Sequence, residues 1–134
     1  MAKKEIMTDL WVYDMLKEIG VQNDFSAQGS NIKEIDEALA TASKKGTGNV
    51  GFPEYVGVIS DFLIVIEDKA SLNKHINRND KDLIAEDVKS VTDYAVNGAL
   101  FYGKHLAKNT TYKKIIAIGV SGNEKKSQNI PFIY

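Results

Sequence analysis

The chain has 134 residues, of which 43% are hydrophobic and 26% are charged, and its formal net charge is −1. This size and apolar content predict one domain with a single core. The near-neutral charge argues against a dedicated nucleic-acid binder, which is usually strongly basic. The absence of cysteine excludes disulfides and thiolate metal sites. No apolar run approaches the ~20 residues of a membrane span and none follows the basic first residues, so we expect no signal peptide and a cytoplasmic location.

The first predicted element is an amphipathic helix over residues 8–19. Its hydrophobic residues recur at three- and four-residue steps, which is the spacing of one helix face. Thr8 would cap the helix and Gly20 would end it. Such a stripe is typical of a helix that packs against a core.

A second helix would begin after a cap at Ser30 or Asn31 and run to about Ser43. The glycine-containing loop that follows starts with Lys44 and Lys45. It lacks the spacing of a nucleotide-binding P-loop. We therefore keep two interpretations of these lysines, a solvated turn or a contact to DNA phosphate. The apolar stripe of the helix consists of Ile32, Ile35, Leu39 and Ala42.

The most informative segment is a predicted hairpin that carries acids at one end. Phe62–Ile66 is a run of five apolar residues, which suits a central strand buried on both faces. With a tight turn at Ser60 and Asp61, Glu54 lies directly opposite Glu67 and shares its face.

Lys69 follows Glu67 by two residues, so strand alternation places both on one face. Two carboxylates at the end of a buried strand would hold a divalent metal, with an ammonium beside it. The competing acid, Asp61, would be about 20 Å from Glu67 along the strand, so we assign it to the turn.

The second half of the chain completes a mixed sheet. A polar loop over residues 71–80 leads into one long predicted helix over residues 81–108. Residues 114–120 form a second buried strand, and a last strand begins near Ile130. A helical crossover makes the strands at 62–69 and 114–120 parallel. The predicted fold class is α/β, with a mixed central β-sheet flanked by helices.

Pro53-Glu54 followed by Glu67-Asp68-Lys69 resembles the motif of the PD-(D/E)XK nuclease superfamily, with Glu in place of the commoner Asp after the proline. Further blocks, spanning about residues 26–122, resemble the N-terminal nuclease region of type IIG restriction–modification enzymes, which fuse a nuclease to an adenine-N6 DNA methyltransferase. The resemblance implies a restriction-endonuclease-like core. We expect residues 1–134 to be a single nuclease domain, excised from the N-terminus of a larger protein.

The resemblance also implies an activity, a metal and partners. The expected activity is Mg²⁺- or Mn²⁺-dependent hydrolysis of double-stranded DNA, weak in the isolated domain, with methyltransferase and target-recognition domains as partners. Glu54, Glu67 and Lys69 are the expected catalytic residues, and the backbone carbonyl of Asp68 would complete the metal site. Other candidates are Glu37, Asn97 and Tyr102 near the site, and Lys44, Lys45, Lys74 and Arg78 on DNA.

Other interpretations remain open from the residues. Lys69 could neutralise the two glutamates in a purely structural ion cluster. The chain could be a non-catalytic DNA-binding or docking module of a methyltransferase assembly, which would not need the paired acids. It could also be a repair or junction-resolving nuclease with the same chemistry. Metal binding separates the docking module from the two nucleases.

Overall fold

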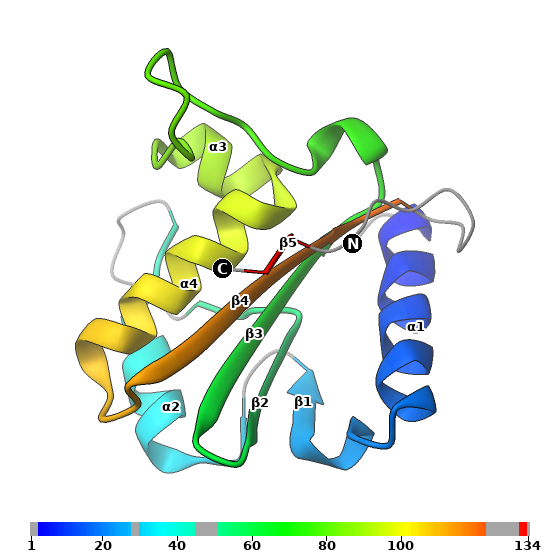
Figure 1. The fold of residues 1–134 in the computed structure, drawn as a ribbon, viewed down its shortest axis with the longest axis vertical. Coiled ribbons are helices and arrows are strands. Elements are labelled where there is room, and N and C mark those ends of the chain that lie inside the picture. The colour runs from blue at the N-terminus through cyan, green and yellow to red at the C-terminus, as the bar shows by residue number, and fades with distance from the viewer. Residues whose placement is uncertain (1–2, 28–29, 45–50, 123–131, 134) are drawn as a thin grey trace.

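The structure is a computed structural model that describes residues 3–27, 30–44, 51–122 and 132–133 (Figure 1). Its helices are α1 (Lys3–Glu18), α2 (Lys33–Leu39), α3 (Val88–Asp93) and α4 (Ala95–Asn109), with short 3₁₀ turns η1 (Gln22–Asp24) and η2 (Leu72–Lys74). Its strands are β1 (Phe25–Ala27), β2 (Tyr55–Ile59), β3 (Phe62–Lys69), β4 (Lys114–Ser121) and β5 (Phe132–Ile133). Within these residues, no helix combines the length and apolar character that crossing a bilayer requires.

The five strands form one sheet in the order β1-β2-β3-β4-β5. β3 and β4 are parallel, and the other neighbours are antiparallel. The helices α3 and α4 supply the crossover between the parallel pair, as Figure 1 shows. The predicted mixed α/β sheet is therefore confirmed.

The β2–β3 hairpin has the predicted register. Tyr55 pairs with Ile66 and Val56 with Val65, and Ser60 and Asp61 form the turn. Ser60 adopts φ 57°, a left-handed conformation that glycine normally occupies. The turn therefore forms at Ser60 and Asp61 without the glycine that tight hairpin turns usually contain. Continuing the register by one residue sets Glu54 opposite Glu67.

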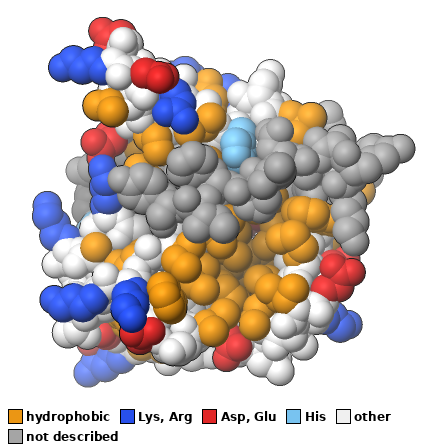
Figure 2. Space-filling view, in the orientation of Figure 1, with side chains coloured by type: hydrophobic (Ala, Val, Ile, Leu, Met, Phe, Trp, Pro, Cys, Tyr) orange, Lys and Arg blue, Asp and Glu red, His pale blue; other side chains and the backbone are white. Residues whose placement is uncertain are grey.

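The two faces of the sheet are covered differently. Leu63 and Val65 of β3 point into a core built with α2 and α4. Ile66 and its neighbours on the opposite face pack with Val12 and Leu16 of α1. Ile64 on that face is only half-buried, and Figure 2 shows hydrophobic side chains visible over the sheet between α1 and α4.

Gly119 of β4 explains how closely α4 approaches the sheet. A Cβ at this position would lie 2.6 Å from the backbone nitrogen of Val96. No side chain fits there without displacing the helix backbone. The start of α4 therefore rests directly on β4.

The single helix predicted over residues 81–108 is wrong. Residues 81–87 are not helical, and the remainder is divided into α3 and α4 at Tyr94, which has φ −115° and ψ 137°. Asp87 caps α3 by accepting a hydrogen bond from the Ser90 amide, while the Val96 amide donates to the carbonyl of His75. Tertiary hydrogen bonds thus interrupt a pattern that reads as continuous.

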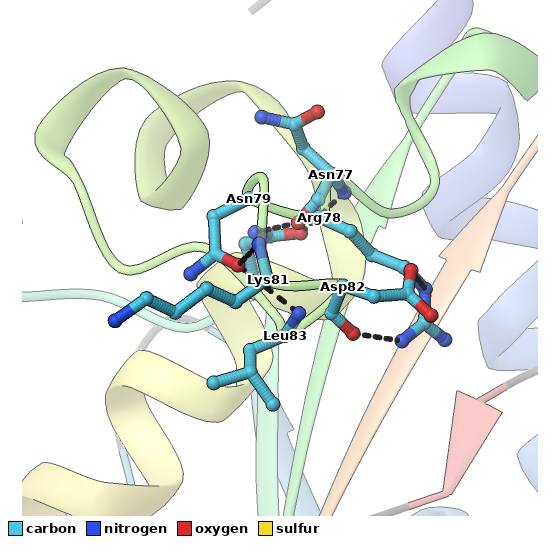
Figure 3. Close-up of polar contacts among 7 residues, drawn as sticks. Asn77, Arg78, Asn79, Lys81, Asp82 and Leu83 are labelled. Atoms are coloured by element: carbon cyan, nitrogen blue, oxygen red, sulfur yellow. Dashed lines mark hydrogen bonds and ion pairs between the residues drawn. The ribbon is translucent and has the colours of Figure 1, made fainter.

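The segment before α3 is a compact loop (Figure 3). The side chain of Asn79 accepts hydrogen bonds from the amides of Lys81 and Leu83. Arg78 donates to the carbonyl of Asp82 and pairs with its carboxylate at 4.0 Å. Asp82 has φ 62°, a conformation that the helix predicted here could not contain.

The observed ends of α1 and α2 also differ from the predicted ones. Thr8 does not cap α1, which begins at Lys3, but lies inside it with its hydroxyl bonded to the carbonyl of Gly122. Gly20 does follow the end of the helix, with φ 80°. α2 is shorter than predicted, and its N-cap is Ile32.

Candidate functional site

Glu67 lies near the end of β3 and is 4% exposed. Its Oε2 is 2.7 Å from Nζ of Lys44, and its Oε1 accepts a hydrogen bond of 2.9 Å from the backbone amide of Glu54. The hairpin has the predicted register, but the expected shared face is wrong for the side chains, because the carboxylate of Glu54 lies with Asp9 and Asp68. The contact runs through the backbone of Glu54 and not between the two side chains.

α4 leaves room for this ion pair at Gly98. A Cβ there would lie 3.1 Å from both Oε2 of Glu67 and Nζ of Lys44. The Lys44 ammonium also lies 5.0 Å from the ring centroid of Tyr102. Burial and the charge of Glu67 raise the pKa of Tyr102 above its usual range. Glu67 is thus enclosed and neutralised on the α4 side.

The opposite face of β3 carries a second acidic group. Asp9 of α1, Glu54 and Asp68 each offer a carboxylate oxygen, and these oxygens lie within 4.8 Å of one another. Glu54 immediately precedes β2, so strand alternation does not dictate the direction of its side chain. Its carboxylate joins Asp9 and Asp68, while its amide faces Glu67.

Two hydrogen bonds fix the part of α1 that supplies Asp9. Thr8, which is fully buried, donates to the carbonyl of Gly122 beyond β4. Tyr55 of β2 donates to the carbonyl of Asp9 over 3.0 Å. Burial and the charges of Asp9, Asp68 and Glu54 raise the pKa of Tyr55 to about 12, so it remains a donor.

Asp68 is 2% exposed, and neither of its carboxylate oxygens has a hydrogen-bond donor among the described residues. Burial raises the pKa of this carboxyl well above its usual range. When one of the two carboxyls is protonated, a hydrogen bond between Asp68 and Asp9 raises this pKa further, as do the charges of Asp9, Glu54 and Glu67. A buried carboxylate needs a proton or a cation. The oxygen-only donor set and the orphaned oxygens of Asp68 fit a hard divalent cation.

Lys69 is the last residue of β3, and it pairs in register with Ser121 of β4. Its side chain is half-buried. The pKa of Asp93 is lowered chiefly by the hydrogen bond from Lys89, and the charge of Lys69 adds a smaller contribution. The hydroxyl of the fully buried Ser121 lies 3.0 Å from Nδ1 of His75. Burial lowers the pKa of His75. This end of β3 and β4 therefore gathers a lysine, a histidine and the acids.

Of the three further candidates predicted near the site, only one lies beside Glu67. Tyr102 lies beside Lys44 and Glu67, as described. Asn97 does not, because its side-chain amide is engaged with the backbone of Asn77 and Ala85. Glu37 is exposed and forms a surface pair with Lys33, so it is outside both acidic groups. The sequence predicts that all three lie on helices, but the packing of those helices decides where each side chain points.

The predicted DNA-binding residues have different surroundings. Lys44 is committed to Glu67, which the sequence did not indicate. Lys74 is half-buried with its ammonium 5.0 Å from the ring centroid of Tyr94. Arg78 is exposed in the loop of Figure 3, and Lys45 lies outside the described residues. Asp61 forms the turn and pairs with Lys114 at 2.9 Å, away from the acidic groups.

Asp9 is the residue that sequence reasoning missed. The helix around it reads as a packing element, and no motif connects residue 9 with residues 54 and 68. A polar residue among Leu10, Trp11 and Val12 is ordinary on an amphipathic helix. Only the docking of α1 on the sheet reveals its neighbours.

Comparison with known proteins gives one informative relative. No protein-family model matches the chain, and no solved structure matches it. The chain is 35% identical over 134 residues to the type II restriction enzyme and methyltransferase RM.BcgI of Heyndrickxia coagulans. The match covers 98% of this chain and 21% of that protein, so the chain spans about one fifth of its length. The chain is therefore similar, over nearly its whole length, to one region of a restriction–modification protein.

Proposed function

We propose that this chain is the metal-dependent DNA-cleaving region of a restriction–modification enzyme of the PD-(D/E)XK type. The observation that carries the proposal is the hairpin register, in which the amide of Glu54 bonds to the carboxylate of Glu67 two residues before Lys69. The similarity to a restriction enzyme and methyltransferase supports the same reading.

In this proposal, Glu67 and the carbonyl of Asp68 would hold Mg²⁺ or Mn²⁺ together with Glu54. The carboxylate of Glu54 lies with Asp9 and Asp68 in the metal-free chain and would have to turn towards Glu67 to join the ion. Such an ion would offset phosphate charge and lower the pKa of a bound water. Lys69 contributes positive charge where the transition state gains negative charge. Lys44 serves as the neutralising cation of Glu67 in the metal-free protein, because a buried carboxylate cannot remain unpaired.

Double-stranded DNA and the methyltransferase and target-recognition domains are the proposed partners. A net charge of −1 provides little electrostatic attraction for DNA. Lys45, Lys74 and Arg78 are proposed to contact phosphate, which positions the backbone but does not read sequence. We therefore expect the 134-residue chain alone to cut DNA slowly and without sequence preference.

The competing function is a non-catalytic DNA-binding or docking module. The observation that favours it is the Lys44–Glu67 pair, which satisfies a buried glutamate without any metal. In such a module, Lys69 would have no chemical role. The two functions therefore predict different consequences of removing Lys69.

The test is Lys69→Ala in the restriction–modification polypeptide that we propose contains this chain. Single-turnover cleavage with Mg²⁺ should fall by about 10²–10³, the typical effect of losing one transition-state contact. DNA binding and methylation should be unchanged. Lys108→Ala, at an exposed position near the end of α4, is the matched control and should cut normally. Cleavage by Lys69→Ala near the wild-type rate would contradict the proposal.

A further inference from the structure

The acidic group on the α1 face of the sheet overlaps the proposed cleavage residues at Glu54 and Asp68, but it adds Asp9 and uses the carboxylate of Asp68. It combines side chains from three separate segments, namely Asp9 of α1, Glu54 before β2 and Asp68 of β3. The carboxylates of Glu67 and Asp68 point to opposite faces, because adjacent strand residues alternate. Glu54 gives its amide to Glu67 and its carboxylate to this group. Asp68 gives its carboxylate to this group and only its carbonyl to the proposed cleavage site.

Asp68 is the observation that points to a ligand. Its carboxylate is almost completely buried, and both oxygens lack a donor within the described part of the chain. Oδ1 of Asp9 is buried and lacks a donor there too. Three carboxylates whose oxygens lie within 4.8 Å repel one another unless something positive lies between them.

The ammonium of Lys44 does not serve this group. Lys44 forms its 2.7 Å pair with Glu67 on the α4 face. The hydrogen bonds of Thr8 and Tyr55 hold α1 so that Asp9 stays at the group. The arrangement is therefore fixed by the fold and does not depend on a mobile surface side chain.

We propose that Asp9, Glu54 and Asp68 form a divalent-cation site on the α1 face of the sheet. Three carboxylates and no nitrogen or sulfur ligand suit Mg²⁺ or Mn²⁺, with water completing the coordination. The site requires the carboxylate of Asp68, whereas the cleavage motif uses only its carbonyl. It holds whether or not the chain cleaves DNA, and binding the ion would fasten α1 to the sheet.

The test is a Mn²⁺ titration of the 134-residue chain without DNA, by calorimetry and by the shift of its thermal unfolding temperature. Asp9→Asn and Asp68→Asn should each weaken Mn²⁺ binding at least about tenfold and remove most of the metal-induced shift. Asp14→Asn, an exposed acid on the same helix, is the matched control and should bind as the wild type does. Glu67→Gln should retain this binding.

Unchanged Mn²⁺ binding in both Asp9→Asn and Asp68→Asn would overturn the site. So would wild-type protein that shows no binding at millimolar Mn²⁺. Loss in Glu67→Gln as complete as in Asp9→Asn would replace the separate site with one that includes both faces. If Asp68→Asn fails to fold, Asp9→Asn alone decides, because Asp9 is only half-buried. A chain that binds no Mn²⁺ at all would count against both proposals, whereas unchanged binding in Asp9→Asn and Asp68→Asn would overturn this site alone. The cleavage rate of Lys69→Ala tests only the proposed function.

Discussion

Glu67 and Asp68 are adjacent in the chain and equally buried, at 4% and 2% exposure, yet they meet opposite environments. Glu67 faces α4, where Lys44 and the amide of Glu54 satisfy its two oxygens. Asp68 faces α1, where Asp9 and Glu54 add negative charge and no described donor reaches it. The α4 face is thus electrostatically complete, whereas the α1 face requires a proton or a cation.

The difference shows how a single strand can separate two chemical tasks. Alternation directs neighbouring side chains to different faces, and the elements covering each face decide their protonation and their ligands. α4 brings a glycine and a tyrosine that accommodate an ion pair. α1 brings another acid, so the carboxylates of two adjacent residues meet different surroundings.

The largest expected effect compares the packing of the two faces. Leu63→Ala, in the core under α2 and α4, should reduce the free energy of unfolding by about 4 kcal/mol through lost burial and an unfilled cavity. Ile64 lies on the α1 face and is only half-buried, so Ile64→Ala should reduce the free energy of unfolding by about half as much. Urea denaturation of both variants checks this, and equal losses would mean that the faces are equally closed.

Removing Lys44 tests whether the α4 face depends on its ion pair. Lys44→Met should destabilise the metal-free chain by about 3 kcal/mol, because it leaves the buried carboxylate of Glu67 without a cation. The double variant Lys44→Met/Glu67→Gln should recover most of this loss. Chemical denaturation in EDTA provides the measurement. A neutral Lys44→Met would show that water or another group satisfies Glu67.

Replacing Asp68 by a neutral residue should stabilise the chain, in contrast to removing Lys44. In EDTA at neutral pH, Asp68→Asn should raise the free energy of unfolding by about 1 kcal/mol, since the raised pKa of Asp68 makes the carboxyl take up a proton on folding and an amide need not, and the new amide can donate to Asp9. Glu67→Gln is the matched variant on the other face and should not stabilise, because its partner is Lys44. Destabilisation by Asp68→Asn would indicate a donor that compensates this carboxylate.

The smallest expected effect concerns pH. Burial lowers the pKa of His75 beside Ser121, so its protonated form is disfavoured in the folded chain. As pH falls below the ordinary value of about 6.5, the unfolded chain takes up the proton first and stability declines. The decline in unfolding temperature from pH 7 to pH 5 should therefore be smaller in His75→Gln than in the wild type. Identical pH profiles would place His75 in water.

The sequence-based predictions are correct where an element depends on residues close in the chain, and they fail where it depends on contacts between distant residues. The hairpin, its turn and the pairing of Glu54 with Glu67 follow from an apolar run, a period of two and a four-residue turn. The parallel β3–β4 pair follows from the helical connection between them. The helix predicted over 81–108 fails because two tertiary hydrogen bonds compete with helical continuity. The Val96 amide donates to the carbonyl of His75, and the Asn97 side chain donates to the carbonyl of Ala85.

The sequence by itself determined the mixed sheet, its register and the presence of acids and a lysine at the end of β3. These features depend on side-chain periodicity and on neighbours within one hairpin, so they are encoded locally. Only the tertiary structure decided that Lys44 pairs with Glu67 and that Asp9 joins Glu54 and Asp68. The partners are 23 residues apart in the first case and span residues 9–68 in the second. Such contacts arise from the docking of helices on opposite faces, which no local pattern specifies.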